Sequence, residues 1–170
     1  MEDTVTSKDE LQEGYTYTLS AGVGEHFDPE FKPSLTPQEM LELGIMGGAY
    51  FSNAALQEFP ETWYRKAKRS KDGLQHKELN FFNVSASQSR KEWQKKGWID
   101  KDDPRGWIQW YFRYYLGRRL PEIDARQIKR WKAFRRHATQ IQRNCKPKDL
   151  VCRPRQRQSL LHWAYDSRRM

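Results

Sequence analysis

The sequence predicts a mainly α-helical protein built as a single compact domain, and three observations predict it. The chain has 170 residues, the size of one ordinary domain. Its second half contains several helix-start patterns separated by glycine or proline. Aromatic residues make up 14% of the chain, including seven tryptophans, which is enough to build a core and unlike a disordered chain. We therefore expect about five to seven helices, with room for one small β hairpin near the N-terminus.

The first part of the chain predicts short elements joined by polar segments. Residues 1–14 are polar, acidic and aperiodic, so we expect a disordered acidic tail. Residues 15–19 alternate β-favouring side chains and predict one short strand. A capping box over Thr36-Pro37-Gln38-Glu39 starts a short helix that Gly44 ends. Two further short helices are expected, through 54–56 and over 61–68.

The second part gives clearer helix signals. Ser89-Arg90-Lys91-Glu92 is a second capping box, and Gly97 ends the helix it starts. Asp103-Pro104 supplies a cap and a first-turn proline for the next helix. The longest helix starts at Pro121, because its apolar residues recur every three or four positions. The expected helices are 90–96, 104–116, 121–143 and one that starts at Pro154 and carries Leu160, Leu161, Ala164 and Tyr165. The domain would thus span 15–170, with an acidic part (15–89) and a basic aromatic part (90–170).

Charge is divided unevenly along the chain. Residues 1–89 carry 8 basic and 14 acidic side chains, a net of −6, whereas residues 90–170 carry 23 basic and 8 acidic ones, a net of +15. The basic part also contains six of the seven tryptophans. Such asymmetry favours an anionic partner for the basic part. In the alternative interpretation, the acidic part folds over the basic part and neutralises it.

Tryptophan, tyrosine and arginine are unusually dense between residues 103 and 119. A helix there would be apolar on most of its surface, which is typical of a buried central helix. The alternative is a pocket wall, since flat aromatic faces can stack on a nucleic-acid base. The stacking candidates under this alternative are Tyr50, Trp107, Trp110, Tyr111, Tyr114 and Trp131.

The same segment carries a resemblance. The sequence DPRGWIQWYFRYYLGRR at 103–119, followed by DARQIKRW at 124–131, resembles a group of proteins that share a DPRGWxQWYxRYYxGRR core and a following DxRQIxRW. The likeness covers roughly residues 36–132 and is densest at 98–131. No activity is attached to that group, so the resemblance implies neither a cofactor nor a catalytic residue.

Basic side chains follow the long helix and the run from 152 to 158. Lysine and arginine that neutralise phosphates are the main source of non-specific nucleic-acid affinity. The order of helices 90–96, 104–116 and 121–143 is also similar to that of three-helix DNA-binding modules. The alternative for these residues is an ordinary solvated face. The candidates for binding DNA, RNA or another anion are Arg105, Arg118, Arg119, Arg126, Lys129, Arg130, Arg136, Arg153, Arg155 and Arg157.

Binding of nucleic acid is the first functional hypothesis, and two others stay open. An enzyme acting on a nucleotide or a modified base would use the aromatic pocket, with Arg118, Arg119, Arg126 and Arg155 on the phosphate. Its candidate acids and bases are Asp124, His162 and Asp166, of which the last two lie one helical turn apart. A protein-interaction module would bind an acidic partner through the basic face. Metalloprotease, serine-hydrolase, phosphate-loop, dinucleotide and EF-hand motifs are absent from the sequence, so no cofactor is expected.

The two cysteines leave three arrangements open. Cys145 and Cys152 could be reduced and packed, joined by a disulfide, or joined with His137 and His162 in a zinc site. Their spacing matches none of the usual zinc patterns, so no metal is expected. No apolar run approaches the roughly 20 residues of a membrane span, and the acidic start lacks the features of a signal or transit peptide. We therefore expect no membrane partner and an intracellular location, cytoplasmic or nuclear.

Overall fold

The structure, a computed structural model, describes residues 3–85 and 100–170. The predicted fold class is confirmed: the described residues form six α-helices and a single two-stranded sheet near the N-terminus. The helix predicted over 90–96, with its capping box and Trp98, lies outside the described residues. Among the helices that are described, none combines the length and apolarity of a transmembrane segment.

The elements of the acidic part are short. Strands β1 (Asp3–Thr6) and β2 (Thr16–Leu19) pair antiparallel. They are followed by α1 (Pro37–Glu42), α2 (Asn53–Leu56), α3 (Glu61–Tyr64) and the 3-10 helix η1 (Lys77–Leu79). The longer helices belong to the basic part, which contains α5 (Trp107–Leu116), α6 (Pro121–Asn144), α7 (Pro154–His162) and the 3-10 helix η2 (Ser167–Arg169).

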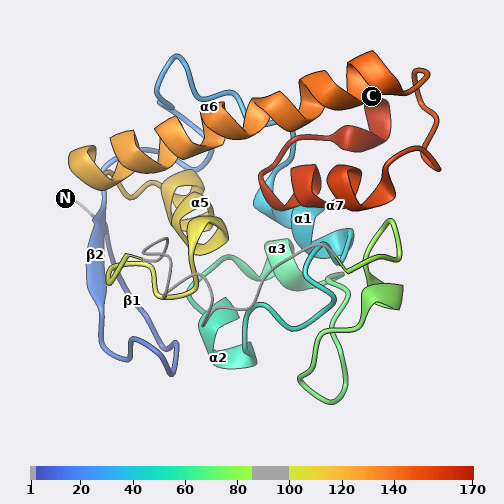
Figure 1. The fold of residues 1–170 in the computed structure, drawn as a ribbon. Helices are drawn as coiled ribbons and strands as arrows, with labels where there is room; N and C mark the ends of the chain where they lie inside the picture. Colours follow the sequence, from blue (N-terminus) through green and yellow to red (C-terminus); the bar gives the residue numbers. More distant parts are fainter. Residues whose placement is uncertain (1–2, 86–99) are drawn as a thin grey trace.

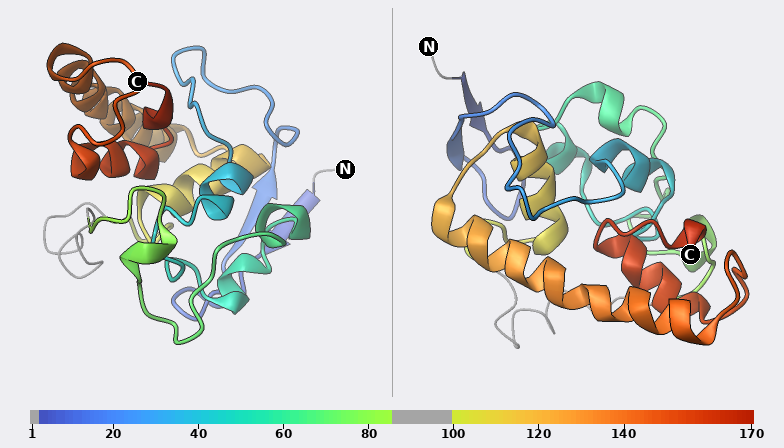
Figure 2. Two further views of the ribbon diagram at one scale, coloured as in Figure 1. Left: turned by 90° about the vertical axis from the view of Figure 1, so that its right-hand side faces the viewer. Right: turned by 90° about the horizontal axis from the view of Figure 1, so that it is seen from above.

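The long helix α6 crosses the whole molecule. Figure 1 shows α5 packed under its N-terminal half and α7 under its C-terminal half, with the β hairpin at one end and α1 to α3 on the far side of α5. The view from above shows α6 along one edge of the molecule (Figure 2). One side of α6 therefore faces the core, and its other side is available to solvent.

Helix α5 forms the centre of the core. Nine of its ten residues are buried, as its nearly continuous apolar surface predicts. The helix ends at Gly117, whose φ of +132° brings the backbone against the Ala21 carbonyl, where a Cβ would lie only 2.2 Å from that oxygen. The Ser20 N–H also donates to the Gly117 carbonyl at 2.9 Å, so the end of β2 is fixed to the end of α5.

The N-terminal segment corrects one prediction. Residues 1–14 are expected to be disordered, but residues 3–6 form β1 opposite β2, and the Asp9 side chain is fully buried. The prediction is wrong for residues 3–14 because their polar side chains have partners within the fold. Asp9, for example, accepts hydrogen bonds from Arg105 and Gln109.

Helix boundaries differ from prediction at three places. Helix α3 ends at Tyr64 rather than at 68. Helix α7 ends at His162, because Ala164 adopts a left-handed φ of +61° that a helix cannot continue through. Helix α5 begins at Trp107 rather than at 104, with Gly106 before it and not Asp103 as its cap. The Asp103 carboxylate is instead occupied by two arginines. The capping box of α1 and the proline start of α6 are confirmed.

Candidate nucleic-acid interface

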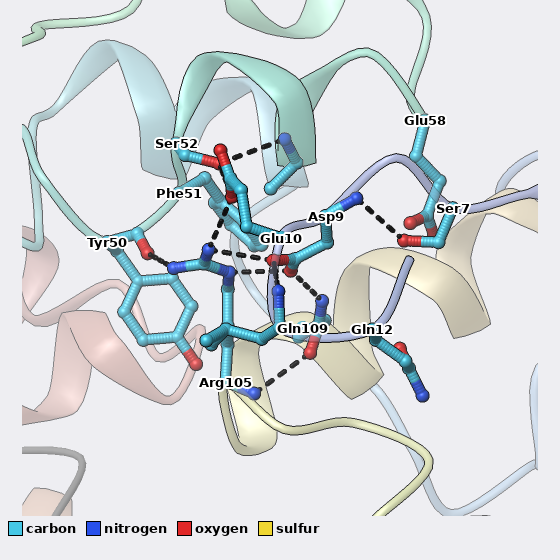
Figure 3. A network of polar contacts seen from close by, with 12 residues as sticks. Ser7, Asp9, Glu10, Gln12, Tyr50, Phe51, Ser52, Glu58, Arg105 and Gln109 are labelled. Atoms are coloured by element: carbon cyan, nitrogen blue, oxygen red, sulfur yellow. Dashed lines mark hydrogen bonds and ion pairs between the residues drawn. The ribbon is translucent and has the colours of Figure 1, made fainter. Parts of the chain in front are cut away.

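Arg105, predicted to bind an external anion, is occupied within the protein. Its guanidinium donates to both carboxylate oxygens of buried Asp9, at 2.6 and 2.8 Å, and to the Tyr50 carbonyl at 2.8 Å. Figure 3 shows this side chain enclosed by Asp9, Glu10 and the Tyr50 backbone, with Gln109 bonded to the same Asp9. Burial raises the pKa of Asp9, but the charge and hydrogen bonds of Arg105, together with hydrogen bonds from the Leu11 N–H and Gln109, hold that pKa below its usual value.

Two further arginines of the 103–119 segment are fully buried. The Arg113 guanidinium donates to both oxygens of Glu58, at 2.7 and 2.9 Å, and to Asp103 at 3.0 Å. Arg118 donates to the second oxygen of Asp103 at 2.7 Å, so one carboxylate bridges two cations. Tyr17 bonds to Glu58 from the hairpin, and burial beside that carboxylate raises the pKa of Tyr17. Neither arginine can reach an external phosphate.

Arg119 is held by backbone oxygens and by an aromatic face. It donates to the carbonyls of Tyr114 and Glu25, at 2.5 and 2.7 Å, and its guanidinium lies 3.8 Å from the centre of the Tyr114 ring. Arg119 therefore has a structural role that needs no ligand, because it donates hydrogen bonds to carbonyl groups at the C-terminal end of α5.

The predicted stacking residues lie in the core. Trp107, Trp110, Tyr111, Tyr114 and Trp131 each expose 4% or less of their surface. Two of these side chains also have their polar atoms occupied, because Trp110 Nε1 donates to Asp124 at 2.8 Å and Tyr111 donates to the Leu35 carbonyl. Tyr50 packs edge-on against Phe51, with ring centres 4.8 Å apart. The core interpretation is therefore confirmed for the five buried aromatics, whereas Tyr50 is only partly buried.

Asp124 is a structural carboxylate rather than an open acid. Besides accepting from Trp110, it accepts from the Leu120 N–H at 2.8 Å and so satisfies a free donor at the start of α6. Burial raises its pKa, against the effect of those two bonds. Both oxygens have donors, so the group is not presented to a substrate.

His162 and Asp166 do not form the expected pair. The buried His162 ring accepts at Nε2 from the Gln158 amide, 3.1 Å away, and burial lowers its pKa to about 4. Asp166 is bound instead to Arg168 and Arg169, with Nε to oxygen distances of 2.8 and 3.2 Å. The enzyme hypothesis needs a pocket that gathers Trp107, Arg118, Arg126 and a carboxylate, and the first two of these are packed in the core.

The cysteines form a disulfide, Cys145–Cys152, which links the end of α6 to the start of α7. The zinc arrangement is thereby overturned, because both thiolates are consumed. His137, the third suggested ligand, lies within hydrogen-bond distance of Gln156 at 2.9 Å. No cluster of three or more potential metal ligands occurs in residues 3–85 and 100–170.

The outer side of α6 keeps its cations exposed. We define the α6 row as Arg126, Lys129, Arg136 and Arg143, all exposed. Arg126 pairs with Asp100, whereas the other three have no carboxylate within ion-pair distance among the described residues. Arg130 lies to one side of the row, with its guanidinium 5.4 Å from the half-buried Trp163 ring.

The three arginines around the start of α7 differ in their exposure to solvent. Arg153 and Arg155 are exposed, but Arg157 is fully buried. Arg157 donates to the carbonyls of Cys152, Ser167 and Met170, at 2.7, 2.8 and 2.9 Å, so it fixes the chain around α7. The predicted anion site around all three is therefore reduced to the two exposed ones.

Sequence reasoning missed the carboxylates that neutralise the segment 103–119. Asp9 lies in the supposed tail, and Glu58 lies between two short helices, 55 positions from its partner Arg113. Neither belongs to a motif. The one available signal was the excess of arginines in an apolar segment, because buried cations require buried anions.

Comparison with family models, with curated proteins and with solved structures gives no match.

Proposed function

We propose that the protein binds nucleic acid through the sugar-phosphate backbone, using the α6 row. The strongest support comes from comparing the cations that pair with carboxylates inside the fold with those that stay exposed on α6. Arg105 is neutralised by Asp9 of the N-terminal segment, Arg113 by Glu58 of the acidic part, and Arg118 by Asp103. Lys129, Arg136 and Arg143 are exposed on the longest helix and have no carboxylate within ion-pair distance in residues 3–85 and 100–170.

The spacing of the α6 row suits an extended polyanion. Its members follow one another by three, seven and seven positions, which keeps them on one face of a helix. From Arg126 to Arg143 the row is about 25 Å long, because a helix rises about 1.5 Å per residue. That length corresponds to about seven base pairs of B-form DNA. A row of this length contacts several phosphates at once.

The position of the aromatic side chains indicates the mode of binding. Base stacking needs exposed rings, but the tryptophans and tyrosines of α5 are in the core. Phosphate contacts alone carry no sequence information. We therefore expect binding of duplexes with little sequence preference.

The test is fluorescence anisotropy with a labelled 20-base-pair duplex of DNA or RNA, at several salt concentrations. The variant carries Lys129→Glu, Arg136→Glu and Arg143→Glu together. Each phosphate contact contributes about 0.9 to the slope of log K against log salt, so we expect the slope to decrease by about 2.7. Affinity at low salt should fall by about a hundredfold or more.

The matched control changes the same total charge elsewhere. Lys66→Glu, Lys71→Glu and Lys77→Glu alter three exposed lysines of the segment 61–79, which lies away from α6 (Figure 1). This variant should retain the wild-type slope. If both variants lose affinity equally, net charge and not the α6 row determines binding. If no duplex binds in low salt, or poly-glutamate competes as well as DNA at equal charge, the proposal fails, and in the second case an acidic protein partner is favoured.

A further inference from the structure

The disulfide loop, residues 145–152, has a fixed shape although it lies on the surface. Its ends are joined by the Cys145–Cys152 bond. Within it, the Asp149 N–H donates to the Lys146 carbonyl and the Cys152 N–H to the Asp149 carbonyl, both at 3.1 Å. Outside contacts hold it too, since the Lys148 N–H donates to the Met170 carbonyl at 2.8 Å. Few surface loops are held at so many points.

This fixed loop presents an exposed apolar side chain. Val151 exposes 87% of its surface, more than any other exposed large hydrophobic side chain in the described part of the chain. Four exposed cations lie within five positions of it in the sequence, and none has a carboxylate within ion-pair distance among residues 3–85 and 100–170. These cations are Lys146, Lys148, Arg153 and Arg155. The one acid of the loop, Asp149, is also exposed, and its carboxylate accepts a hydrogen bond from the Val151 N–H at 3.3 Å.

The disulfide loop lies next to the C-terminal end of α6. Both Figure 1 and the view from above in Figure 2 show it directly beyond the C-terminal end of α6. Arg143, the last member of the row, is two positions before Cys145. A polyanion that follows α6 to its C-terminal end therefore comes close to the disulfide loop.

We propose that the disulfide loop is a second contact with duplex nucleic acid, in which Val151 enters the minor groove between two base steps. The flanking cations would hold the phosphates on either side. Minor-groove proteins combine lysine and arginine with an inserted apolar side chain, which unstacks the bases and bends the duplex. Such a wedge has to be rigid, which the disulfide and the backbone bonds of the loop provide. This inference rests on the proposed function.

A basic loop with an apolar tip could also meet an anionic membrane, but the loop fits a groove better. Membrane-surface binding uses a broad apolar face with several large side chains. Here Leu150 is only half exposed, so Val151 is the single side chain available. The cations around it also extend into a line along α6, which matches a strand of phosphates.

Bending is measured by energy transfer between dyes at the two ends of a 24-base-pair duplex, at saturating protein. We expect wild-type protein to raise the transfer, because a bent duplex brings its ends together. Val151→Ser should abolish this rise and lower the affinity by about fivefold to tenfold, with the salt slope unchanged. Val151→Leu keeps an apolar side chain at this position and should bend the duplex as wild type does. Leu74→Ser, at another highly exposed apolar residue, is the matched control and should behave as wild type.

The possible results separate this inference from the proposed function. If the duplex binds with the expected salt slope but stays straight, or if Val151→Ser bends it fully, the wedge is refuted and the backbone binding stands. If no duplex binds at low salt, both fail. If Val151→Ser loses binding to phosphatidylserine vesicles while duplex bending is unaffected, the loop is a membrane contact and the inference is overturned.

Discussion

At the scale of the residue, Asp103 is a buried carboxylate that neutralises two buried arginines at once. Its two oxygens accept from Arg113 and Arg118, and all three side chains are buried. Removing one partner of a buried ion pair leaves an uncompensated charge in a low-dielectric interior, which costs more than the pair itself contributes. The cost arises because the remaining guanidinium groups cannot recover their hydration.

Asp103→Asn should therefore lower the free energy of unfolding by about 3–5 kcal/mol, as measured by urea titration at pH 7. The amide keeps the shape of the side chain but not its charge. Asp102→Asn is the matched control, because its half-buried carboxylate makes no ion pair in the described residues. It should change the stability by no more than about 0.5 kcal/mol. Equal effects of the two changes would contradict the assigned role of Asp103.

His162 predicts a pH dependence of stability. Gln158 donates its amide N–H groups to the Ile45 carbonyl and to His162 Nε2, so the ring accepts and is neutral in the fold. Its pKa is lowered by burial to about 4, below the ordinary value of about 6.5. The unfolded chain therefore binds more protons between these values, and stability decreases as pH falls from about 6.5 to about 4. The contribution of this residue is about 3 kcal/mol.

The measurement is urea unfolding at pH 7, 6, 5 and 4.5 for wild type and His162→Gln. Glutamine does not titrate, so the variant should lose less stability between pH 6.5 and 4.5 than wild type does. Other titrating groups contribute equally to both proteins and cancel in the comparison. Parallel pH profiles would show that His162 is protonated in the fold.

At the scale of the element, the N-terminal hairpin and the loop after it supply anions to the centre of the molecule. Strand β1 pairs with β2, and the following loop inserts the Asp9 carboxylate against Arg105. The segment thus stabilises α5 from a distance of about a hundred positions in the chain, with Gln109 bonded to Asp9 as well. A disordered tail would contribute nothing of this kind.

Deleting residues 1–10 should lower the free energy of unfolding by about 3 kcal/mol or more, because Arg105 then loses its buried carboxylate. Asp9→Asn should reproduce most of this loss. Glu10→Gln serves as the comparison, since the Glu10 side chain is 58% exposed and its pair with Arg105, at 3.4 Å, is loose. It should cost no more than about 1 kcal/mol. If the deletion left the free energy of unfolding unchanged, the prediction of a disordered tail would be supported instead.

At the scale of the whole molecule, the arginines around α5 that pair with carboxylates are largely buried and the unpaired cations of the α6 row are exposed. The carboxylates of Asp9, Glu58 and Asp103 accompany arginines into the interior, while the α6 row stays at the surface. The interpretation in which acidic residues neutralise basic ones within the fold therefore holds for the arginines around α5, which pair with Asp9, Glu58 and Asp103. An external anion remains a proposal for the α6 row.

The same sorting shows what the sequence could predict. Helix starts at α1 and α6 follow from local capping and proline patterns, and the burial of α5 follows from its apolar surface. The pairing of Arg105 with Asp9 could not be predicted, because it depends on contacts between residues 96 positions apart. The arginines of the 103–119 segment therefore looked like a binding site, although most of them stabilise the fold.

The packing of the tryptophans gives the molecule its own optical reporters. Trp63, Trp107, Trp110 and Trp131 are shielded from water, so their fluorescence will move to longer wavelength when the core opens. Trp163 is different, because it is half-buried and lies beneath Arg130 of α6. Its emission is thus expected to respond to events near Arg130 on α6, so that unfolding and the proposed binding to α6 can both be followed without attaching a dye to the protein.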